Sequence, residues 1–217
     1  MAAVFSTLLA YFIGGINPAY ILARFRGFDI RRVGSRNAGA SNALMLLGKG
    51  RGVFVMLFDI AKAYGAVQLA GLIAANFLWC RELAASAVVI GHVFPAYMRF
   101  RGGKGLSCLG GVVLALSPRL FLLLFLAELV VLFSTRYLCF VSISGSILFP
   151  ILYAWGKGDW LCWLFLLPVS AVISCKHWVN LRRIRAGEEA RISILWNRSK
   201  ELERLGQGAE TEDTKEQ

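Results

Sequence analysis

Long apolar segments separated by short polar ones run through most of the chain. Six segments carry few or no charged residues: 3–23, 53–75, 83–98, 120–134, 138–155 and 160–175. A helix crosses the hydrocarbon core of a bilayer with about 20 apolar residues, within a range of about 17–25. Several of these segments reach that length and the others come close to it. The pattern therefore predicts an all-α fold, a polytopic bundle of transmembrane helices.

One further apolar segment is harder to assign. Residues 106–116 are too few for a comfortable span, and the triplet Ser117-Pro118-Arg119 separates them from the next segment. We expect a short helix here or one half of a re-entrant hairpin. The bundle then has about seven spans, or about five spans plus the hairpin. Because the two options differ by two crossings, both give the same orientation of the termini.

Composition agrees with a membrane protein of one domain. Hydrophobic residues make up 57% of the 217 residues, against about 45–50% in soluble globular chains. We predict a single membrane-embedded domain over residues 1–205 and no soluble domain. Residues 206–217 are polar and acidic without apolar periodicity, which predicts a disordered tail. No internal repeat is evident, and this disfavours carriers built from duplicated halves.

The formal net charge of +11 raises the question of a nucleic-acid partner. We exclude nucleic acid because the basic residues stand in clusters beside the apolar segments. Basic loops stay on the cytoplasmic side of a membrane, so the N-terminus should lie outside and the C-terminus in the cytoplasm. The clusters are Arg24, Arg26, Arg31, Arg32, Arg36, Lys49 and Arg51; Arg99, Arg101 and Lys104; and Arg182, Arg183, Arg185 and Arg191.

Polar residues at the predicted cytoplasmic face form three candidate sites, of which the first is segment 34–42. It holds only small, polar and cationic residue types. Small residues let a backbone approach a ligand closely, and successive N–H groups can form an anion-binding nest. Arg36 adds a guanidinium fork suited to phosphate. The alternative is a flexible loop at a helix end. The candidate residues are Ser35, Arg36, Asn37, Ala40, Ser41 and Asn42.

The second candidate site, segment 100–105, places glycines around a single lysine. The P-loop spacing G-x-x-x-x-G-K-[ST] is absent. An apolar segment follows, however, so the loop precedes a helix N-terminus, where N–H groups and the helix dipole favour an anion. The alternative is a turn whose lysine merely follows the preference for basic cytoplasmic loops. We favour a phosphate site made of Gly102, Gly103, Lys104 and Gly105.

The third candidate site follows the last apolar segment. His177 and Asn180 are three residues apart and so share one helix face. Arg183 and Glu189 come next. A histidine alone at a membrane boundary is as readily explained as an interfacial residue. Its companion Asn180 and the basic residues after it favour a functional site.

Ionisable residues also occur inside the apolar segments. Asp59 and Lys62 stand three residues apart, and Glu128 lies in the middle of an apolar run. Such groups are costly in a membrane and count as functional candidates by default. We favour a structural pair for Asp59 and Lys62, facing the interior of the bundle. The sequence suggests no partner for Glu128.

Taken in order, these segments resemble the bacterial acyl-phosphate:glycerol-3-phosphate acyltransferase family. The resemblance rests on G-S-x-N-x-G-A-[ST]-N at 34–42, G-H-x-F-P at 91–95 with F-x-G-G-K-G at 100–105, and H-x-x-N-x-x-R at 177–183. It extends from about residue 12 to about residue 191. Each motif alone is weak, but three in order at the family's spacing are specific.

The resemblance implies a multi-helical protein of the cell inner membrane that works without a metal or cofactor. Its partners would be acyl-phosphate and glycerol-3-phosphate as substrates, and membrane lipids. The active site would lie at the cytoplasmic face. The catalytic residues would be Lys104, His177 and Asn180. The phosphate and substrate ligands would be Ser35, Asn37, Ala40, Ser41, Asn42, Gly102, Gly103, Lys104, Gly105, Ser142, His177 and Asn180, with Glu189 in support.

The chemistry of an acyl-phosphate fits these residues. It is a mixed anhydride whose carbonyl is already activated, so no serine or cysteine nucleophile is needed. The site must hold two phosphorylated substrates and aim the glycerol 1-hydroxyl at the carbonyl. The general base is left open between His177 and the acyl-phosphate oxygens. Acyltransferases that use thioesters resemble one another in H-x-x-x-x-D, whereas Tyr97 follows His92 and Arg182 follows His177 at that spacing.

Three positions depart from the pattern that the resemblance implies. Arg36 stands where the family has glycine, Met45 where it has arginine, and Val179 where it has glutamate. Either Arg36 replaces the guanidinium missing at position 45, or it is a further basic residue of the cytoplasmic loop that faces solvent; we favour the first. Two other functions are left open: a divergent lipid-binding paralogue with weak or no activity, and a polytopic carrier of anions or phosphorylated solutes. A carrier would need charges at mid-membrane depth, and the gathering of polar residues at one face favours the enzyme.

Overall fold

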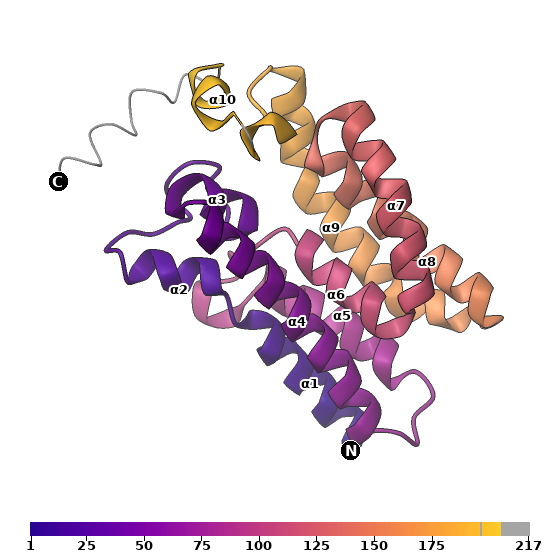
Figure 1. The fold of residues 1–217 in the computed structure, drawn as a ribbon. Helices are drawn as coiled ribbons and strands as arrows, with labels where there is room; N and C mark the ends of the chain where they lie inside the picture. The colour runs from indigo at the N-terminus through magenta and orange to yellow at the C-terminus, as the bar shows by residue number, and fades with distance from the viewer. Residues whose placement is uncertain (196, 205–217) are drawn as a thin grey trace.

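The computed structural model describes residues 1–195 and 197–204, and all regular secondary structure in that part of the chain is helical (Figure 1). This confirms the predicted all-α fold. The predicted tail, 206–217, lies outside the described residues, as do residues 196 and 205 of the predicted domain. The helices are α1 (Ala2–Gly15), α2 (Pro18–Arg24), α3 (Ala40–Leu47), α4 (Lys49–Ile73), α5 (Cys80–Val93), α6 (Leu106–Leu116), α7 (Pro118–Thr135), α8 (Leu138–Lys157), α9 (Leu161–Arg185) and α10 (Arg198–Arg204), with short 3-10 helices at Ala96–Met98 and Ile192–Leu195.

Four of the described helices, α4, α7, α8 and α9, are long and apolar enough to cross a membrane. The pair α1 and α2 would make a fifth span, bent by 41° at the break between them. Only 6% of the most apolar stretch of α7 is buried, and Leu122, Phe125 and Phe133 are exposed on it. Exposed apolar surface of this extent is costly in water and suits contact with lipid. The number of spans stays a prediction.

Segment 106–116 forms the short helix α6, one of the two forms expected from the sequence. It lies against α4, and a Cβ atom added to Gly111 would come within 2.2 Å of the Ile60 carbonyl oxygen. The helix ends at Ser117, whose hydroxyl oxygen accepts a hydrogen bond from the Leu120 amide at 3.3 Å. Pro118 then occupies the first turn of α7, a position where its missing N–H costs nothing. Ser117 and Pro118 therefore stop one helix and start the next.

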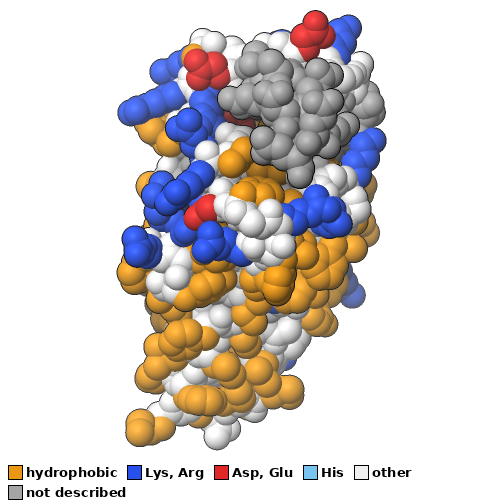
Figure 2. Space-filling model, turned by 90° about the vertical axis from the view of Figure 1, so that its left-hand side faces the viewer, with side chains coloured by type: hydrophobic (Ala, Val, Ile, Leu, Met, Phe, Trp, Pro, Cys, Tyr) orange, Lys and Arg blue, Asp and Glu red, His pale blue; other side chains and the backbone are white. Residues whose placement is uncertain are grey.

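The polar segments gather at one end of the bundle. The N-terminus lies at the lower end in Figure 1, whereas α3, α10 and the last turns of α9 lie at the upper end. Figure 2 shows Lys and Arg side chains over the upper half of one face, above a mostly hydrophobic lower half. This division agrees with a membrane-embedded lower part and a basic cytoplasmic end. An outside N-terminus stays a prediction from the positions of the basic residues.

Helices α1 and α5 touch along their backbones. A Cβ atom added to Gly91 would lie 2.0 Å from the Tyr11 carbonyl oxygen, and one added to Gly14 would lie 2.1 Å from the Val88 carbonyl oxygen. Two glycines thus face the opposite helix at one crossing, as small residues do where membrane helices pack closely. This contact fixes α1 against the helix that leads into segment 100–105.

Gly91→Ala is expected to lower the free energy of unfolding by about 1–3 kcal/mol, because the added methyl group meets backbone and cannot be accommodated by a side-chain shift. Thermal unfolding of the purified protein in detergent would measure the loss. Gly65→Ala is the matched control, since nothing lies within 4 Å of its added Cβ in α4 and alanine favours a helix. Equal melting temperatures for the two variants would contradict the close crossing of α1 and α5.

A buried group of charges joins α4, α5 and the break after α1. The Lys62 ammonium is 2.7 Å from Asp59 Oδ1 and 3.2 Å from His92 Nδ1, and it donates a hydrogen bond of 2.5 Å to the Ile16 carbonyl oxygen. The side chains of Asp59, Lys62 and His92 are no more than 3% exposed. The predicted structural pair is therefore present, facing the interior. It also supplies a donor to a carbonyl group that α1 leaves free where the chain bends.

Glu128 has a partner that the sequence did not suggest. The Ser144 hydroxyl in α8 lies 2.9 and 2.7 Å from the two carboxylate oxygens of Glu128 in α7. Ser144 also lies 2.6 Å from the Phe140 carbonyl oxygen, one turn earlier in its own helix. A polar contact of this kind joins neighbouring helices in a membrane. We therefore regard Glu128 as structural.

Candidate active site

Three segments far apart in the sequence line one cleft of about 360 Å³ at the polar end of the bundle. The loop between α2 and α3 contributes Arg31, Ser35, Arg36 and Asn37; the loop before α6 contributes Arg101, Gly102, Gly103 and Lys104; and α9 contributes Lys176, Val179 and Arg183. Cationic side chains from all three segments thus face one space. Concave sites of this kind, with several cations and no lining carboxylate, attract anions such as phosphate groups.

A chain of hydrogen bonds ties the second segment to the third. The Lys104 ammonium donates to Asn180 Oδ1 at 2.5 Å, and Asn180 Nδ2 donates to a Glu189 carboxylate oxygen. Burial lowers the pKa of Lys104, and the charge of Glu189 opposes this shift. An ammonium group has three donors, so two remain for a ligand in the cleft. Asn180 therefore orients Lys104, and Glu189 in turn orients Asn180.

The glycines before Lys104 serve to bring the loop against α5. A Cβ atom added to Gly102 would lie 2.2 Å from the His92 carbonyl oxygen, and one added to Gly103 would lie 2.2 Å from His92 Nε2. Their amides donate to the carbonyl oxygens of Val93 at 3.0 Å and His92 at 3.1 Å. Because these two amides already donate to carbonyl oxygens, the loop offers an anion the side chains of Arg101 and Lys104 and not the amides of Gly102 and Gly103. Gly105 follows at φ +96°, a conformation that suits glycine.

His177 is buried in α9, three residues before Asn180. Its Nδ1 is 2.9 Å from the Ile173 carbonyl oxygen. Because a carbonyl oxygen can only accept, Nδ1 carries the proton and Nε2 is left as the acceptor in the neutral ring. His177 is not among the residues that line the cleft, although it precedes Val179 and Asn180 on the same helix. As a proton acceptor it would act through Nε2.

The first segment divides into residues that face the cleft and residues that shape the loop. Asn42 is fully buried: its Oδ1 accepts from the Ser35 amide at 3.0 Å, and its Nδ2 donates to the Ile30 and Val33 carbonyl oxygens at 3.0 and 3.1 Å. Asn42 therefore folds the loop that presents Ser35. Ala40 and Ser41 start α3 and do not line the cleft.

Ser142 lies apart from the cleft surface. It is fully buried in α8, and its hydroxyl donates to the Leu138 carbonyl oxygen at 3.0 Å. This acceptor is one turn earlier in the same helix, a bond that serine hydroxyl groups in helices often form. Rotation of the hydroxyl group would free it for another partner. The structure brings the predicted residues Ser35, Arg36, Asn37, Gly102, Gly103 and Lys104 to one cleft, and leaves Ala40, Ser41, Asn42, Gly105, Ser142, His177, Asn180 and Glu189 off its lining.

Arg31 and Lys176 line the cleft although neither was a candidate. The Arg31 guanidinium forms a fork with Asp29, with contacts of 2.9 and 2.7 Å, and donates to the Met98 carbonyl oxygen at 2.7 Å. The hydrogen bond from Arg31 lowers the pKa of Asp29 to about 2. In the sequence, the spacing of Asp29 two residues before Arg31 is the signal that could have identified this pair. Lys176, beside His177, gave no signal beyond its charge.

Arg36 lines the cleft in an unusual backbone conformation, with φ of +58°. This left-handed region favours glycine, the residue that the resemblance implies at this position. Met45, in contrast, is buried in α3 and clusters with Ile194 beyond α9. The guanidinium at position 36 therefore faces the cleft, whereas the side chain at position 45 does not line it.

Arg36→Gly is expected to separate stability from substrate binding. Removing the side chain relieves the left-handed strain, so the free energy of unfolding should be unchanged or higher by up to about 1 kcal/mol. The cleft loses a guanidinium, so the apparent KM for a phosphorylated substrate should rise about tenfold. Thermal unfolding and initial rates on one preparation would measure both.

The companion substitution Met45→Arg tests whether position 45 can supply the missing charge. If Arg36 replaces it, adding Met45→Arg to Arg36→Gly should lower the KM again, giving a coupling energy well away from zero. An unchanged KM in Arg36→Gly would show that Arg36 only faces solvent. Additive effects of the two substitutions would exclude compensation.

Comparison with known proteins gives consistent matches over most of the chain. The family model for glycerol-3-phosphate acyltransferase matches residues 4–187. A glycerol-3-phosphate acyltransferase of Thermoanaerobacter pseudethanolicus is 37% identical over 193 residues, which cover 88% of this chain and 96% of the relative. Glycerol-3-phosphate acyltransferase 1 of Deinococcus radiodurans is 38% identical over 198 residues, with the same coverage.

Solved structures agree with the sequence matches. The crystal structure of PlsY (YgiH), an integral membrane glycerol 3-phosphate acyltransferase in its glycerol 3-phosphate form, superposes with a TM-score of 0.81 at 32% identity. The match covers 90% of this chain and 98% of that one. The lysophosphatidic acid form gives a TM-score of 0.77 at 31% identity.

Proposed function

Because the chain belongs to the glycerol-3-phosphate acyltransferase family, we propose that it transfers an acyl chain from acyl-phosphate to the 1-hydroxyl of glycerol-3-phosphate. The products are 1-acyl-glycerol-3-phosphate and inorganic phosphate. The protein is an acyltransferase and an integral membrane protein, like the relatives that it matches over most of their length. We assign the reaction to the cleft that contains Lys104.

One observation carries the assignment: a half-buried lysine, held by Asn180, which is in turn bonded to Glu189, lines a cleft together with further cations. The known relatives include structures in a glycerol 3-phosphate form and a lysophosphatidic acid form. Both ligands carry a phosphate monoester, which has a charge of about −1.5 to −2 at neutral pH. The volume of about 360 Å³ falls in the lower part of the range of ligand pockets. The cleft is therefore suited to the polar parts of the reactants, while the acyl chain lies among the apolar helices.

The residues of the cleft account for the proposed reaction. Attack of the glycerol 1-hydroxyl on the acyl carbonyl forms an ester bond and breaks the bond between that carbon and the phosphate oxygen. The electron pair of the broken bond leaves with phosphate. Lys104 and the guanidinium groups stabilise the negative charge that develops on both phosphates and hold them together against repulsion. The hydroxyl proton passes to His177 Nε2 or directly to an oxygen of the leaving phosphate.

The location of the cleft follows from the same charges. We propose that the protein spans the cell inner membrane several times, with the cleft at the cytoplasmic face. The basic residues around the cleft and at the end of α9 support this, since basic segments stay on the cytoplasmic side. Water-soluble glycerol-3-phosphate would then reach the cleft from the cytoplasm and the acyl donor from the bilayer.

A comparison of acyl donors tests the proposal. Purified protein should form lysophosphatidate from glycerol-3-phosphate with palmitoyl-phosphate, and should form none with palmitoyl-coenzyme A or palmitoylated acyl carrier protein. Activity with a thioester in the absence of acyl-phosphate would overturn the donor assignment. Binding of both substrates without turnover would instead identify a divergent lipid-binding paralogue.

A further inference from the structure

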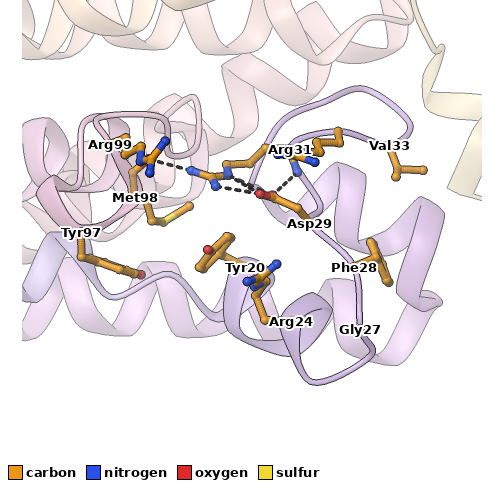
Figure 3. A pocket seen from close by; sticks show the side chains of 11 residues that line it. Tyr20, Arg24, Gly27, Phe28, Asp29, Arg31, Val33, Tyr97, Met98 and Arg99 are labelled. Atoms are coloured by element: carbon orange, nitrogen blue, oxygen red, sulfur yellow. Dashed lines mark hydrogen bonds and ion pairs between the residues drawn. The ribbon is translucent and has the colours of Figure 1, made fainter.

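A second and larger cleft, of about 550 Å³, adjoins the candidate active site. We call it the arginine basin and define it by Tyr20, Arg24, Arg31, Arg32, Tyr97 and Arg99 among its lining residues. Arg31 lines both clefts, so the two clefts meet at this side chain, and its ion-pair partner Asp29 lines the basin. In Figure 3 the side chains of Tyr20, Arg24 and Arg31 converge from the two sides of the basin.

The charge of the basin is strongly unbalanced. Asp29 is the one carboxylate on its lining, and Arg31 neutralises it with an ion pair of 2.7 Å. Within the described residues no ion pair joins Arg24, Arg32 or Arg99 to a carboxylate. Three guanidinium groups therefore lack a counter-charge there. Guanidinium forks of this kind suit the oxygens of a phosphate group.

Contacts among Tyr20, Arg31 and Tyr97, and the loop that carries Arg99, hold the basin in shape. The guanidinium of Arg31 lies 4.7 Å from the Tyr20 ring centroid, and the ring of Tyr97 meets Tyr20 edge-on at 6.3 Å. In the loop that carries Arg99, Arg99 and Phe100 adopt consecutive left-handed conformations, with φ of +53° and +57°. Such strain persists where neighbouring contacts enforce it, and here Phe100 N donates to the Pro95 carbonyl oxygen at 3.0 Å. The loop that carries Arg99 therefore has a conformation fixed by its own hydrogen bonds.

The surroundings of the basin indicate a ligand that is also apolar. Helix α2, which carries Tyr20 and Arg24, bends away from α1 by 41° at the polar end of the apolar bundle. Ile21 of α2 is exposed, and Phe25, which directly follows this helix, is 85% exposed. Figure 2 shows the basic side chains of one face bordering the hydrophobic surface below them. A molecule with an anionic head and an acyl chain can contact both surfaces at this depth.

We propose that the arginine basin binds the phosphate monoester head of a membrane lipid, at a site separate from the Lys104 cleft. Three uncompensated guanidinium groups match a monoester dianion better than the single charge of a phosphodiester lipid. The acyl chains of the lipid lie along the exposed apolar side chains beside α2. The proposal goes beyond the acyl-transfer reaction and does not depend on it, since it requires binding alone.

Lipid binding to full-length protein in neutral detergent micelles tests the proposal. The protein carries Lys104→Ala, so that the first cleft is weakened, and the probe is radiolabelled dioleoyl-phosphatidate. Arg24→Gln with Arg99→Gln should raise the dissociation constant about tenfold or more. The matched control is Arg26→Gln with Lys49→Gln, which removes two exposed charges outside the basin and should change the dissociation constant less than about twofold.

Three results would overturn the proposal. An equal loss of binding in the control pair would show that general surface charge attracts the lipid. Phosphatidylglycerol binding as tightly as phosphatidate would exclude selectivity for a monoester. Inorganic phosphate or glycerol-3-phosphate displacing the lipid at equal concentration would identify a site for free phosphate.

Acyl transfer by the unsubstituted protein is measured separately from lipid binding. An inactive protein that still binds phosphatidate through Arg24 and Arg99 would refute the proposed function and support the basin. An active protein whose phosphatidate binding is indifferent to these two arginines would refute the basin and leave the proposed function in place.

Discussion

Lys104→Ala is expected to lower the rate of acyl transfer about a hundredfold or more, a loss typical for removal of one donor that stabilises developing charge. The lysine is a half-buried cation of the cleft, held by Asn180, and two of its three N–H donors remain for ligand oxygens. In the proposed mechanism, the substitution removes a cation that compensates the charge on the leaving phosphate. Initial rates of phosphate release by purified protein would measure the effect.

The substitution should leave the fold intact, because Lys104 lies in a loop outside the long apolar helices. Thermal unfolding of the variant in detergent therefore serves as the internal check. Lys49→Ala is the matched control, since this lysine is exposed and does not line the cleft. Full activity in Lys104→Ala would remove this residue from the site and with it the proposed mechanism.

Lys62→Met is expected to lower the free energy of unfolding by about 3–5 kcal/mol, because it leaves the Asp59 carboxylate buried without its main partner. The Asp59 and Lys62 side chains are almost fully buried and form an ion pair of 2.7 Å. The variant also removes the donor to the Ile16 carbonyl oxygen at the break after α1. Thermal and denaturant unfolding in detergent would measure the loss.

The double variant Asp59→Asn with Lys62→Met separates the charge from the packing. It removes both charges, so it should recover a large part of the stability lost in Lys62→Met, as neutral replacements of buried pairs often do. The difference between the double variant and the sum of the single variants gives the coupling energy of the pair. Strictly additive losses would contradict the buried ion pair.

The sequence predicted the helical architecture because that information is local. Apolar segments of membrane-spanning length determine a helix whatever their neighbours are, since every backbone polar group must be satisfied inside the segment. The same holds for Ser117 and Pro118, which stop α6 and start α7 through their own chemistry. The bend at Ile16 was not predicted. Asn17, which caps α2, and Pro18 in its first turn are the local signals for this break, whereas the hydrogen bond from Lys62 to the Ile16 carbonyl oxygen comes from 46 residues further along the chain.

The candidate site was predicted only in part, for a similar reason. Residue types identified Lys104 and Asn180, and the structure joins them by a hydrogen bond of 2.5 Å. Residue types did not distinguish a side chain that faces the cleft from one that folds the loop. As a phosphate ligand, Asn42 looked as suitable as Asn37. The Asn42 side chain is buried, however, and its amide group is used in three hydrogen bonds with the backbone of the loop.

Charged residues whose role depends on distant partners were also missed. The partner of Glu128 is Ser144 in α8. Their contact depends on how α7 and α8 are aligned with each other, which no local sequence pattern determines. Arg31 was one basic residue among several in its loop. Its position between the two clefts follows from contacts with Asp29 nearby and with Met98 far along the chain.

The most direct test of the proposed function is the stoichiometry of the reaction catalysed by the purified protein. With palmitoyl-phosphate and glycerol-3-phosphate together, we predict one inorganic phosphate released for each 1-acyl-glycerol-3-phosphate formed. Phosphate release should stop when glycerol-3-phosphate is left out. Phosphate release that continues without the acceptor, or consumption of acyl-phosphate that yields no acylated glycerol-3-phosphate, would contradict an acyltransferase at this site.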